Sequence, residues 1–209
     1  MARSRLIVLA SGEGTLLAHL IDACGSEPGG PQIVAVGSDR PDAKALSRAE
    51  EAGIDTFVCR VSDYSDRAEW DSALTETCAA YRPDLVVSAG FLKLLGPAFL
   101  RQFGGRCINS HPALLPSFPG MHGVRDALAY GVKVTGCTVF LIDSGLDSGP
   151  VIAQQAVPVH ADDDEESLTE RIKSAERVLL ARTVREMLSQ GWSVTGRTVR
   201  IGLPEGTSQ

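Results

Sequence analysis

The chain has 209 residues, of which 44% are hydrophobic and 22% are charged. This balance is ordinary for a globular protein, so it excludes disorder for most of the chain and predicts one domain. The net charge of -6 makes an extended nucleic acid a poor partner, whereas a few backbone N–H groups can still bind a small anion.

The sequence also gives little support for a membrane span, a signal peptide or a metal site. No apolar run reaches the roughly 18–20 residues of a membrane span, and the apolar stretch 6–10 is shorter than a signal peptide's core of about 7–15 residues. The five cysteines are scattered and lack metal-ligand spacing. We therefore expect a cytoplasmic protein without a membrane partner, a disulfide framework or a metal.

Short β-branched runs alternate with helical patterns in the first half of the chain, which indicates βαβ units on a parallel sheet. Strands are predicted at Arg5–Ala10, Ile33–Ser38, Thr56–Cys59, Asp84–Ala89 and Arg106–Ser110. Helices are predicted at Thr15–Cys24, Ala43–Ala52, Ser65–Tyr81 and Ala98–Phe103.

The pattern changes after Pro112. A helix at Val124–Tyr130 is followed by two strands, Val134–Ile142 and Val151–Val159, which we expect to be antiparallel to the rest. The acidic run 162–166 opens a long helix, for which Ser167 and Glu170 have capping-box spacing and Gly191 is a plausible stop. One more short strand is predicted at Thr198–Ile201.

These elements predict an α/β fold. We expect a Rossmann-like, open, mostly parallel sheet flanked by helices, with antiparallel strands and a long helix in the C-terminal part. Ligands of such sheets bind outside the carboxyl ends of the strands, where the strand order reverses. That rule selects three segments, which are Ser11–Leu17, Gly90–Leu95 and Asn109–Pro112.

The first of these segments carries a glycine-rich turn. Gly12 and Gly14 let the backbone approach a ligand, and the following helix offers N–H groups to an anion. Leu17 occupies the position of the third glycine in a dinucleotide fingerprint. A single phosphate is therefore favoured over a dinucleotide, and an ordinary turn without a ligand is the alternative.

The third segment places Asn109 two residues before His111 on an extended chain, so both side chains point the same way. An amide donor beside an imidazole suits the stabilisation of an oxyanion. The later loop Asp143–Pro150 carries two carboxylates, and a carboxylate near His111 would stabilise its imidazolium. A structural Asn/His pair and an ordinary Asx turn are the alternatives.

The motif N-x-H-P-x-L-L-P at Asn109–Pro116 resembles the signature of formyltransferases that use 10-formyltetrahydrofolate, and D-x-x-x-D-x-G-P at Asp143–Pro150 matches the same family. The similarity covers most of residues 5–190. It implies that Asn109 and His111 stabilise the oxyanion and that Asp147 supports charged His111. The phosphate loop and the length resemble the branch that formylates glycinamide ribonucleotide in purine synthesis.

The resemblance also implies the binding residues. Those expected at the substrate phosphate and ribose are Gly12, Gly14, Thr15, Leu16, Leu17, Lys173 and Glu176. Those expected at the folate are Arg67, Phe91, Leu92, Lys93, Leu94, Leu95, Asn109, Asp143 and Asp147. Folate acts as a co-substrate, no metal takes part, a homodimer is expected, and the Leu115–Pro116 bond is cis in relatives.

The same resemblance divides the single domain 1–209. About 1–110 would bind the nucleotide phosphate, about 111–191 would bind folate and carry the catalytic groups, and 192–209 would form a tail. The chain also departs from its relatives. Leu16 stands where many have Asn, and Phe140 stands where some have a second histidine, which leaves Asp147 and His111 as the main proton device.

Other functions stay open at this stage. Within the family, the alternatives are a formyltetrahydrofolate hydrolase and a transferase acting on a tRNA-linked or sugar amine. The tRNA enzyme and the hydrolase usually carry a further domain, for which we expect no room here. Outside the family, the alternatives are a silent folate- or nucleotide-binding protein and an oxidoreductase with a nicotinamide cofactor.

Overall fold

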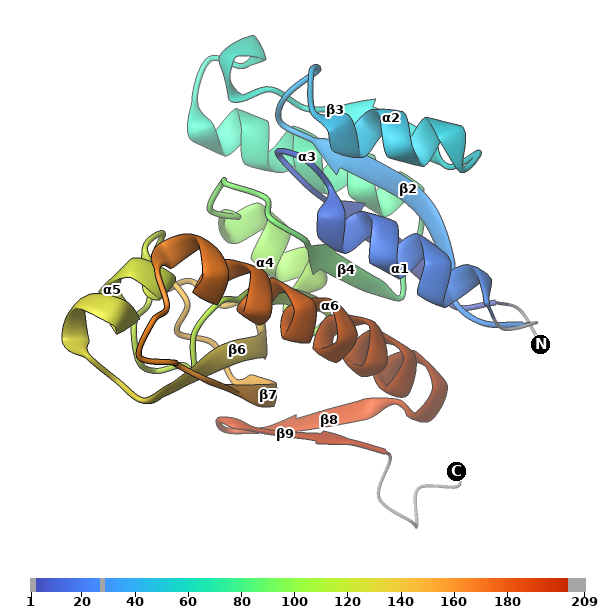
Figure 1. The fold of residues 1–209 in the computed structure, drawn as a ribbon. Helices are drawn as coiled ribbons and strands as arrows, with labels where there is room; N and C mark the ends of the chain where they lie inside the picture. Colours follow the sequence, from blue (N-terminus) through green and yellow to red (C-terminus); the bar gives the residue numbers. More distant parts are fainter. Residues whose placement is uncertain (1–2, 27–28, 203–209) are drawn as a thin grey trace. The chain divides into compact units, whose positions relative to one another are not determined.

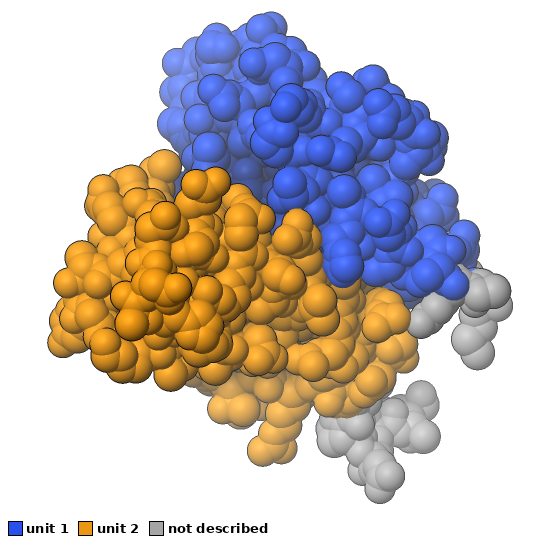
Figure 2. All heavy atoms as spheres, in the orientation of Figure 1, with its two compact units in different colours: residues 1–109 blue, residues 110–209 orange. Residues whose placement is uncertain are grey.

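The computed structural model describes residues 3–26 and 29–202. The chain forms two compact units, residues 1–109 and residues 110–209 (Figure 2). None of the helices in the described part of the chain has the length and apolar character that a membrane span needs.

The first unit contains a parallel sheet. Its strands are β1 (Arg5–Leu9), β2 (Gln32–Ser38), β3 (Asp55–Val58), β4 (Leu85–Ser88) and β5 (Cys107–His111), whose last two residues belong to the second unit. They lie in the order β3-β2-β1-β4-β5 with every neighbouring pair parallel. The side chains of β1 from Leu6 to Leu9 are fully buried, because helices cover both faces of such a sheet.

Four α-helices connect these strands. They are α1 (Thr15–Gly25), α2 (Lys44–Glu51), α3 (Arg67–Ala80) and α4 (Pro97–Phe103), with a short 3-10 helix, η1, at Val61–Asp63. Right-handed crossovers place α1 and α2 on one face and α3 and α4 on the other (Figure 1). The strand order reverses between β1 and β4, so the segments after these two strands lie at the expected ligand-binding edge.

A buried carboxylate begins helix α4. Asp71 of α3 is 3% exposed, and its Oδ1 accepts the N–H of Gly96 at 2.7 Å. Its Oδ2 accepts the N–H groups of Ala98 and Phe99. N–H groups at the start of a helix have no intrahelical partner. Asp71 therefore fixes the end of the segment that follows β4.

The second unit contains an antiparallel hairpin covered by a long helix. Its elements are α5 (Gly123–Tyr130), β6 (Val134–Leu141), β7 (Val151–Pro158), α6 (Glu165–Gln190), β8 (Trp192–Thr195) and β9 (Thr198–Ile201). Strands β6 and β7 pair from Val134 opposite Pro158 to Phe140 opposite Val151. Helix α6 packs on both strands. The predicted fold class is confirmed. The expected direction of the two strands is wrong for one of them, because β6 and β7 are antiparallel to each other and cannot both be antiparallel to the parallel strands.

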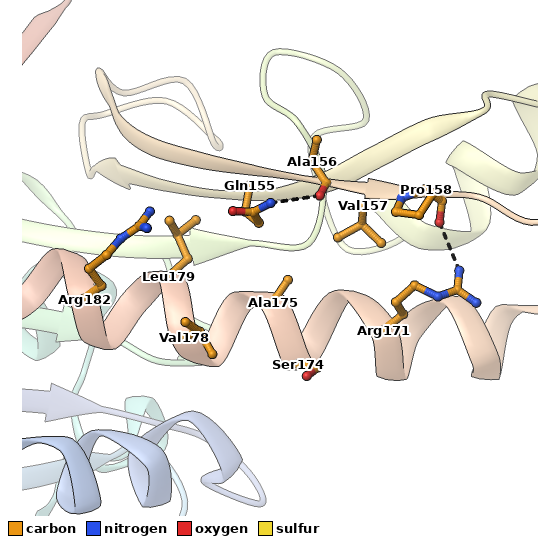
Figure 3. A pocket seen from close by; sticks show the side chains of 10 residues that line it. All are labelled: Gln155, Ala156, Val157, Pro158, Arg171, Ser174, Ala175, Val178, Leu179 and Arg182. Carbon is orange, nitrogen blue, oxygen red and sulfur yellow. Dashed lines mark hydrogen bonds between the residues drawn. The ribbon is translucent and has the colours of Figure 1, made fainter.

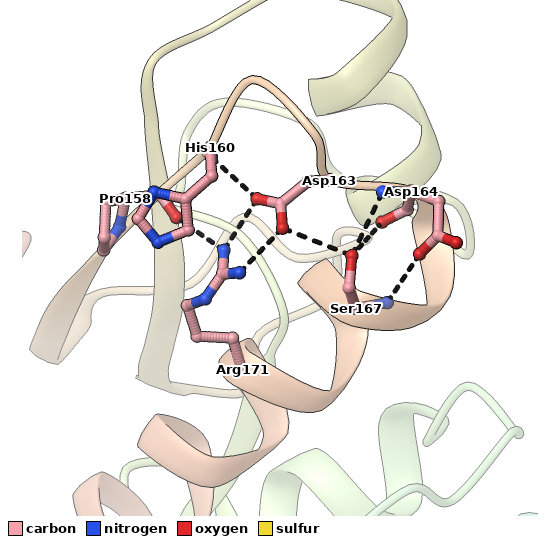
Figure 4. Close-up of polar contacts among 6 residues, drawn as sticks. All are labelled: Pro158, His160, Asp163, Asp164, Ser167 and Arg171. Carbon is pink, nitrogen blue, oxygen red and sulfur yellow. Dashed lines mark hydrogen bonds and ion pairs between the residues drawn. The ribbon is translucent and has the colours of Figure 1, made fainter.

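The start of α6 corrects one prediction. Its N-cap is Asp164, and the capping box joins Asp164 to Ser167, so Ser167 lies inside the helix and does not pair with Glu170 as predicted. Asp163 accepts two hydrogen bonds from Arg171 (Figure 4). The Arg171 guanidinium holds the pKa of Asp163 well below its ordinary range.

Three further results concern the chain's end and the Leu115–Pro116 bond. Strand β8 was not predicted, and it pairs with the predicted β9 in an antiparallel hairpin. The Leu115–Pro116 bond is cis, as the resemblance implied. Residues 192–201 of the expected tail 192–209 form the β8–β9 hairpin, and residues 203–209 lie outside the described residues.

Replacing Asp71 by alanine should lower the free energy of unfolding by about 2–4 kcal/mol, because buried N–H groups lose their acceptor. Asp71→Asn should be nearly as destabilising, since both carboxylate oxygens accept hydrogen bonds and asparagine has only one such oxygen. Urea unfolding measures the effect. Glu76→Gln on the exposed face of α3 is the control, and an equal change in both variants would contradict the capping role.

Candidate functional site

The turn after β1 offers a helix N-terminus to an anion. Gly14 has φ +68°, and a Cβ there would lie 2.8 Å from Ala45 Cα, so only glycine fits. No side chain caps α1, and the first intrahelical bond runs from Ala18 N–H to the Gly14 carbonyl. The amides of residues 15–17 consequently have no helical partner. Because the Leu17 side chain is fully buried, only its backbone can meet a ligand.

The back of this turn is anchored on α2. The Ala45 N–H donates to the Gly12 carbonyl at 3.1 Å, and Arg48 donates to the Glu13 carbonyl at 2.8 Å. Lys44 pairs with the Glu13 carboxylate at 2.9 Å, although both side chains are largely exposed. These contacts fix the turn without using the amides at the start of α1.

The segment after β4, residues 90–95, presents apolar side chains to solvent. Leu92 is 62% exposed and Leu94 is 65% exposed, whereas Phe91 and Leu95 are buried. Neighbouring apolar side chains left in solvent mark a binding surface more often than packing. The segment therefore suits a flat, partly apolar ligand.

Arg67 holds this segment in place. Its guanidinium donates to the Leu94 carbonyl and lies 4.3 Å from the centre of the Trp70 ring. Trp70 in turn stacks on Phe91, with 6.4 Å between ring centroids. Arg67 thus stabilises the segment through protein contacts. We had expected it only as a folate contact.

The structure brings the turn at residues 11–17 and segment 90–95 together. The Ser11 N–H donates to the Gly90 carbonyl at 3.0 Å, and the Leu92 N–H donates to Ser11 Oγ at 2.9 Å. The Leu92 N–H is therefore already used inside the first unit. The Leu94 carbonyl accepts from Arg67 and has a second lone pair that a ligand can use.

We did not predict the residue that links these contacts. Asp39 directly follows β2, and it is buried. It accepts a hydrogen bond from the Ser11 hydroxyl and pairs with Lys93 at 3.2 Å. The position of Asp39 directly after a buried strand was the one signal in the sequence that could have indicated this role. In dinucleotide enzymes that position binds a ribose, whereas here it binds protein groups.

Asn109 and His111 both lie on β5, two residues apart, so their side chains leave the strand on the same side. His111 is 4% exposed. Its Nε2 lies 2.7 Å from the Phe118 carbonyl, and because a carbonyl only accepts, Nε2 carries a proton. Its Nδ1 lies 3.5 Å from Asp147 Oδ2. A ring protonated on both nitrogens satisfies both oxygens.

Two strained residues hold the acceptors around His111. Phe118 has φ +53° and Asp147 has φ +50°, a region that side chains other than glycine rarely adopt and that tends to mark functional sites. The Gly120 N–H donates to Asp147 Oδ2 at 2.8 Å. The loop after His111 is pinned by Thr138, which donates to the Ala113 carbonyl at 2.7 Å.

The loop that carries Asp147 is built by short contacts. Asp143 Oδ1 accepts the Gly145 N–H at 3.0 Å and the Ser148 hydroxyl at 2.7 Å. A Cβ at Gly149 would lie 1.7 Å from the Leu141 carbonyl oxygen, so the loop requires glycine there. Arg197, in the hairpin that we only half predicted, donates to the Ser148 carbonyl at 2.7 Å. Asp143 thus forms the Asx turn that was its alternative role.

Helix α6 contributes a buried carboxylate. Glu176 is 6% exposed, and burial raises its pKa, although the Ser110 hydroxyl and the positive charges of His111 and Lys173 lower it. Ser110 Oγ is buried without a hydrogen bond of ordinary geometry. Lys173 lies one turn earlier and pairs with Glu170 at 3.0 Å. Lys173 and Glu176 therefore differ in exposure despite their spacing.

Other features of the second unit do not extend this site. Phe140 is a core residue, 2% exposed. A cavity of about 370 Å³ lies between residues 155–158 of β7 and six side chains of α6 from Arg171 to Arg182 (Figure 3), and it includes none of the expected site residues. Among residues 3–26 and 29–202, no three His, Cys, Asp or Glu side chains gather closely enough to bind a metal ion.

Known proteins resemble this chain over nearly its whole length. A phosphoribosylglycinamide formyltransferase of Mycobacterium tuberculosis strain H37Rv is 55% identical over 202 residues, which are 96% of this chain and 93% of that protein. The protein of that name from Escherichia coli K12 is 38% identical over 192 residues, which are 92% of this chain and 88% of that protein.

Solved structures and a family model agree with these similarities. The crystal structure of glycinamide ribonucleotide transformylase 1 from Symbiobacterium toebii matches with a TM-score of 0.91 and 40% identity, covering 96% of this chain and 94% of that one. The family described as formyl transferase matches residues 4–184. The chain therefore belongs to the formyl transferase family.

Proposed function

We propose that the chain transfers a formyl group from 10-formyltetrahydrofolate to the amino group of glycinamide ribonucleotide. The observation that carries the proposal is the arrangement at β5, where Asn109 and His111 leave one strand on the same side and Asp147 lies 3.5 Å from His111. The names of two relatives, a phosphoribosylglycinamide formyltransferase and a glycinamide ribonucleotide transformylase, support the same transferred group and acceptor.

The acceptor's amine attacks the formyl carbon, and the formyl oxygen gains negative charge. The Asn109 amide and the His111 ring donate hydrogen bonds to that oxygen, and each such donor contributes roughly 2.7–4 kcal/mol in comparable sites. The Nδ1 of His111 lies 3.5 Å from Asp147, at the outer limit of a hydrogen bond, so this N–H is the ring donor that is left for the formyl oxygen.

The reaction also moves one proton. The bond between the formyl carbon and the folate N10 breaks, the amine loses a proton, and N10 gains one. Asp147 keeps His111 charged and oriented, and assists this transfer through water. The amine is itself the nucleophile, so the proposal needs neither a covalent enzyme intermediate nor a metal.

The binding groups follow the same proposal. The amides of Thr15, Leu16 and Leu17 bind the substrate phosphate at the start of α1, and Lys173 and Glu176 bind near the phosphate and ribose. Segment 90–95, Arg67 and the loop 143–147 bind the folate. A homodimer in the cytoplasm stays the prediction that the family suggests.

The direct test follows tetrahydrofolate release from 10-formyltetrahydrofolate with and without glycinamide ribonucleotide. The proposal predicts release only when the ribonucleotide is present. Release without any acceptor would identify a hydrolase. Folate binding without release in either condition would contradict the proposed acceptor and favour another amine or a binding protein.

Glu176→Gln should separate stability from function. A raised pKa makes the folded chain bind the carboxyl proton more tightly, so the favourable contribution is complete below the unfolded pKa and is lost as the pH rises through the folded pKa. Glutamine removes that loss. Relative to the native chain, the variant's Tm should therefore rise as the pH increases above the ordinary glutamate pKa of about 4, by roughly 2–4 °C for each kcal/mol.

The same variant should weaken glycinamide ribonucleotide binding and raise its KM, while the KM for folate stays unchanged. Glu76→Gln, an exposed change on α3, is the control. A Tm difference that does not change with pH would contradict the account of Glu176 burial.

A further inference from the structure

Asp39 is a buried titratable group that the proposed mechanism does not use. Its side chain is 4% exposed and pairs with the 37% exposed side chain of Lys93. Its other oxygen accepts the Ser11 hydroxyl. Both partners are polar groups at the edge where segments 11–17 and 90–95 meet.

These contacts form a chain of hydrogen bonds that ends in segment 90–95. The Leu92 N–H donates to Ser11 Oγ, the Ser11 hydroxyl donates to Asp39, and Asp39 pairs with Lys93. One carboxylate therefore sets the backbone of Leu92 and the side chain of the next residue. Hydrogen bonds to a buried charge are the strong ones, so this chain limits how the segment moves.

The other contacts of the segment do not replace Asp39. Arg67 and Asp71 hold its far end, at Leu94 and Gly96. The turn at residues 11–17 is held separately, because Ala45 and Arg48 of α2 donate to its Gly12 and Glu13 carbonyls. Loss of Asp39 should therefore disturb Leu92 and Lys93 and leave the amides at the start of α1 in place.

We propose that Asp39 is a positioning residue for folate, acting through the Ser11 hydroxyl on Leu92 and through its ion pair on Lys93. The half-exposed Lys93 ammonium then faces an anionic group of the folate, such as a glutamate carboxylate, with its orientation set by Asp39. This inference rests on the proposed function, because it takes segment 90–95 as a folate contact.

The test compares Asp39→Asn with the native chain. Asparagine keeps an acceptor for Ser11 and removes the charge beside Lys93. The dissociation constant of 10-formyltetrahydrofolate, measured by calorimetry without an acceptor, should rise roughly five- to tenfold, the size of one ordinary net hydrogen bond, because this substitution acts on folate only through Lys93. The KM for glycinamide ribonucleotide and the kcat should change less than about twofold. Asp63→Asn, in the exposed pair with Arg60, is the control.

A double-mutant cycle identifies the route. In a Lys93→Met background, Asp39→Asn should weaken folate binding by less than about twofold further, because two residues that act through one contact are not additive. Ser11→Ala keeps the ion pair and removes the link to Leu92, and it should weaken folate binding roughly threefold. This variant carries the test if Asp39→Asn does not fold.

Three results would overturn the inference. If Asp39→Asn lowers the Tm and does not change the folate affinity, Asp39 has only a structural role. Equal losses of folate and ribonucleotide affinity would indicate a general distortion. Tighter folate binding would show that Asp39 competes with folate for Lys93. A native chain that does not bind folate would instead contradict the proposed function.

Discussion

The burial of the parallel strands decides where this chain can carry chemistry. Strand β1 is fully buried from Leu6 to Leu9, so polar groups enter only where a strand ends. Ser11 lies just after β1, Asp39 follows β2, and Gly90 lies just after β4, while Asn109 and His111 belong to the last three residues of β5. Asn109 of the proposed mechanism lies at such an end, and so do the segments 11–17 and 90–95.

Preorganisation in both units depends on groups that sequence motifs do not include. The Phe118 carbonyl fixes His111 Nε2, and a backbone with positive φ presents that carbonyl. The Gly120 N–H fixes Asp147, and the Ser11 hydroxyl fixes Leu92. In water these groups would reorient around a developing charge, whereas here their neighbours hold them before the substrate arrives.

Most of the fold could be predicted from the sequence, because apolar periodicity and turn residues act locally. The five parallel strands and the long helix follow from such patterns. The start of α6 was misplaced because Asp164 and Ser167 are both good caps, and only the geometry selects Asp164. Strand β8 was missed because Trp192–Thr195 is short and partly exposed.

The candidate site was predictable only in its motif residues. Asn109, His111 and Asp147 carry a recognisable spacing, and the structure places His111 and Asp147 together within the second unit. Asp39 and the Phe118 carbonyl have no such signal, since one is an isolated carboxylate and the other a backbone group. The two uses of Arg67, as support and as expected ligand contact, likewise become visible only when Leu94 and Trp70 are placed.

The most direct measurement of the central claim is the single-turnover rate of formyl transfer in Asp147→Asn. Asparagine tolerates the φ of +50° and can still accept the Gly120 N–H, so the loop keeps its shape while the charge beside His111 is lost. The account predicts a rate lower by roughly 10²–10⁴-fold, a loss much larger than the change in folate affinity, with a Tm close to that of the native chain. A rate near the native value would contradict it.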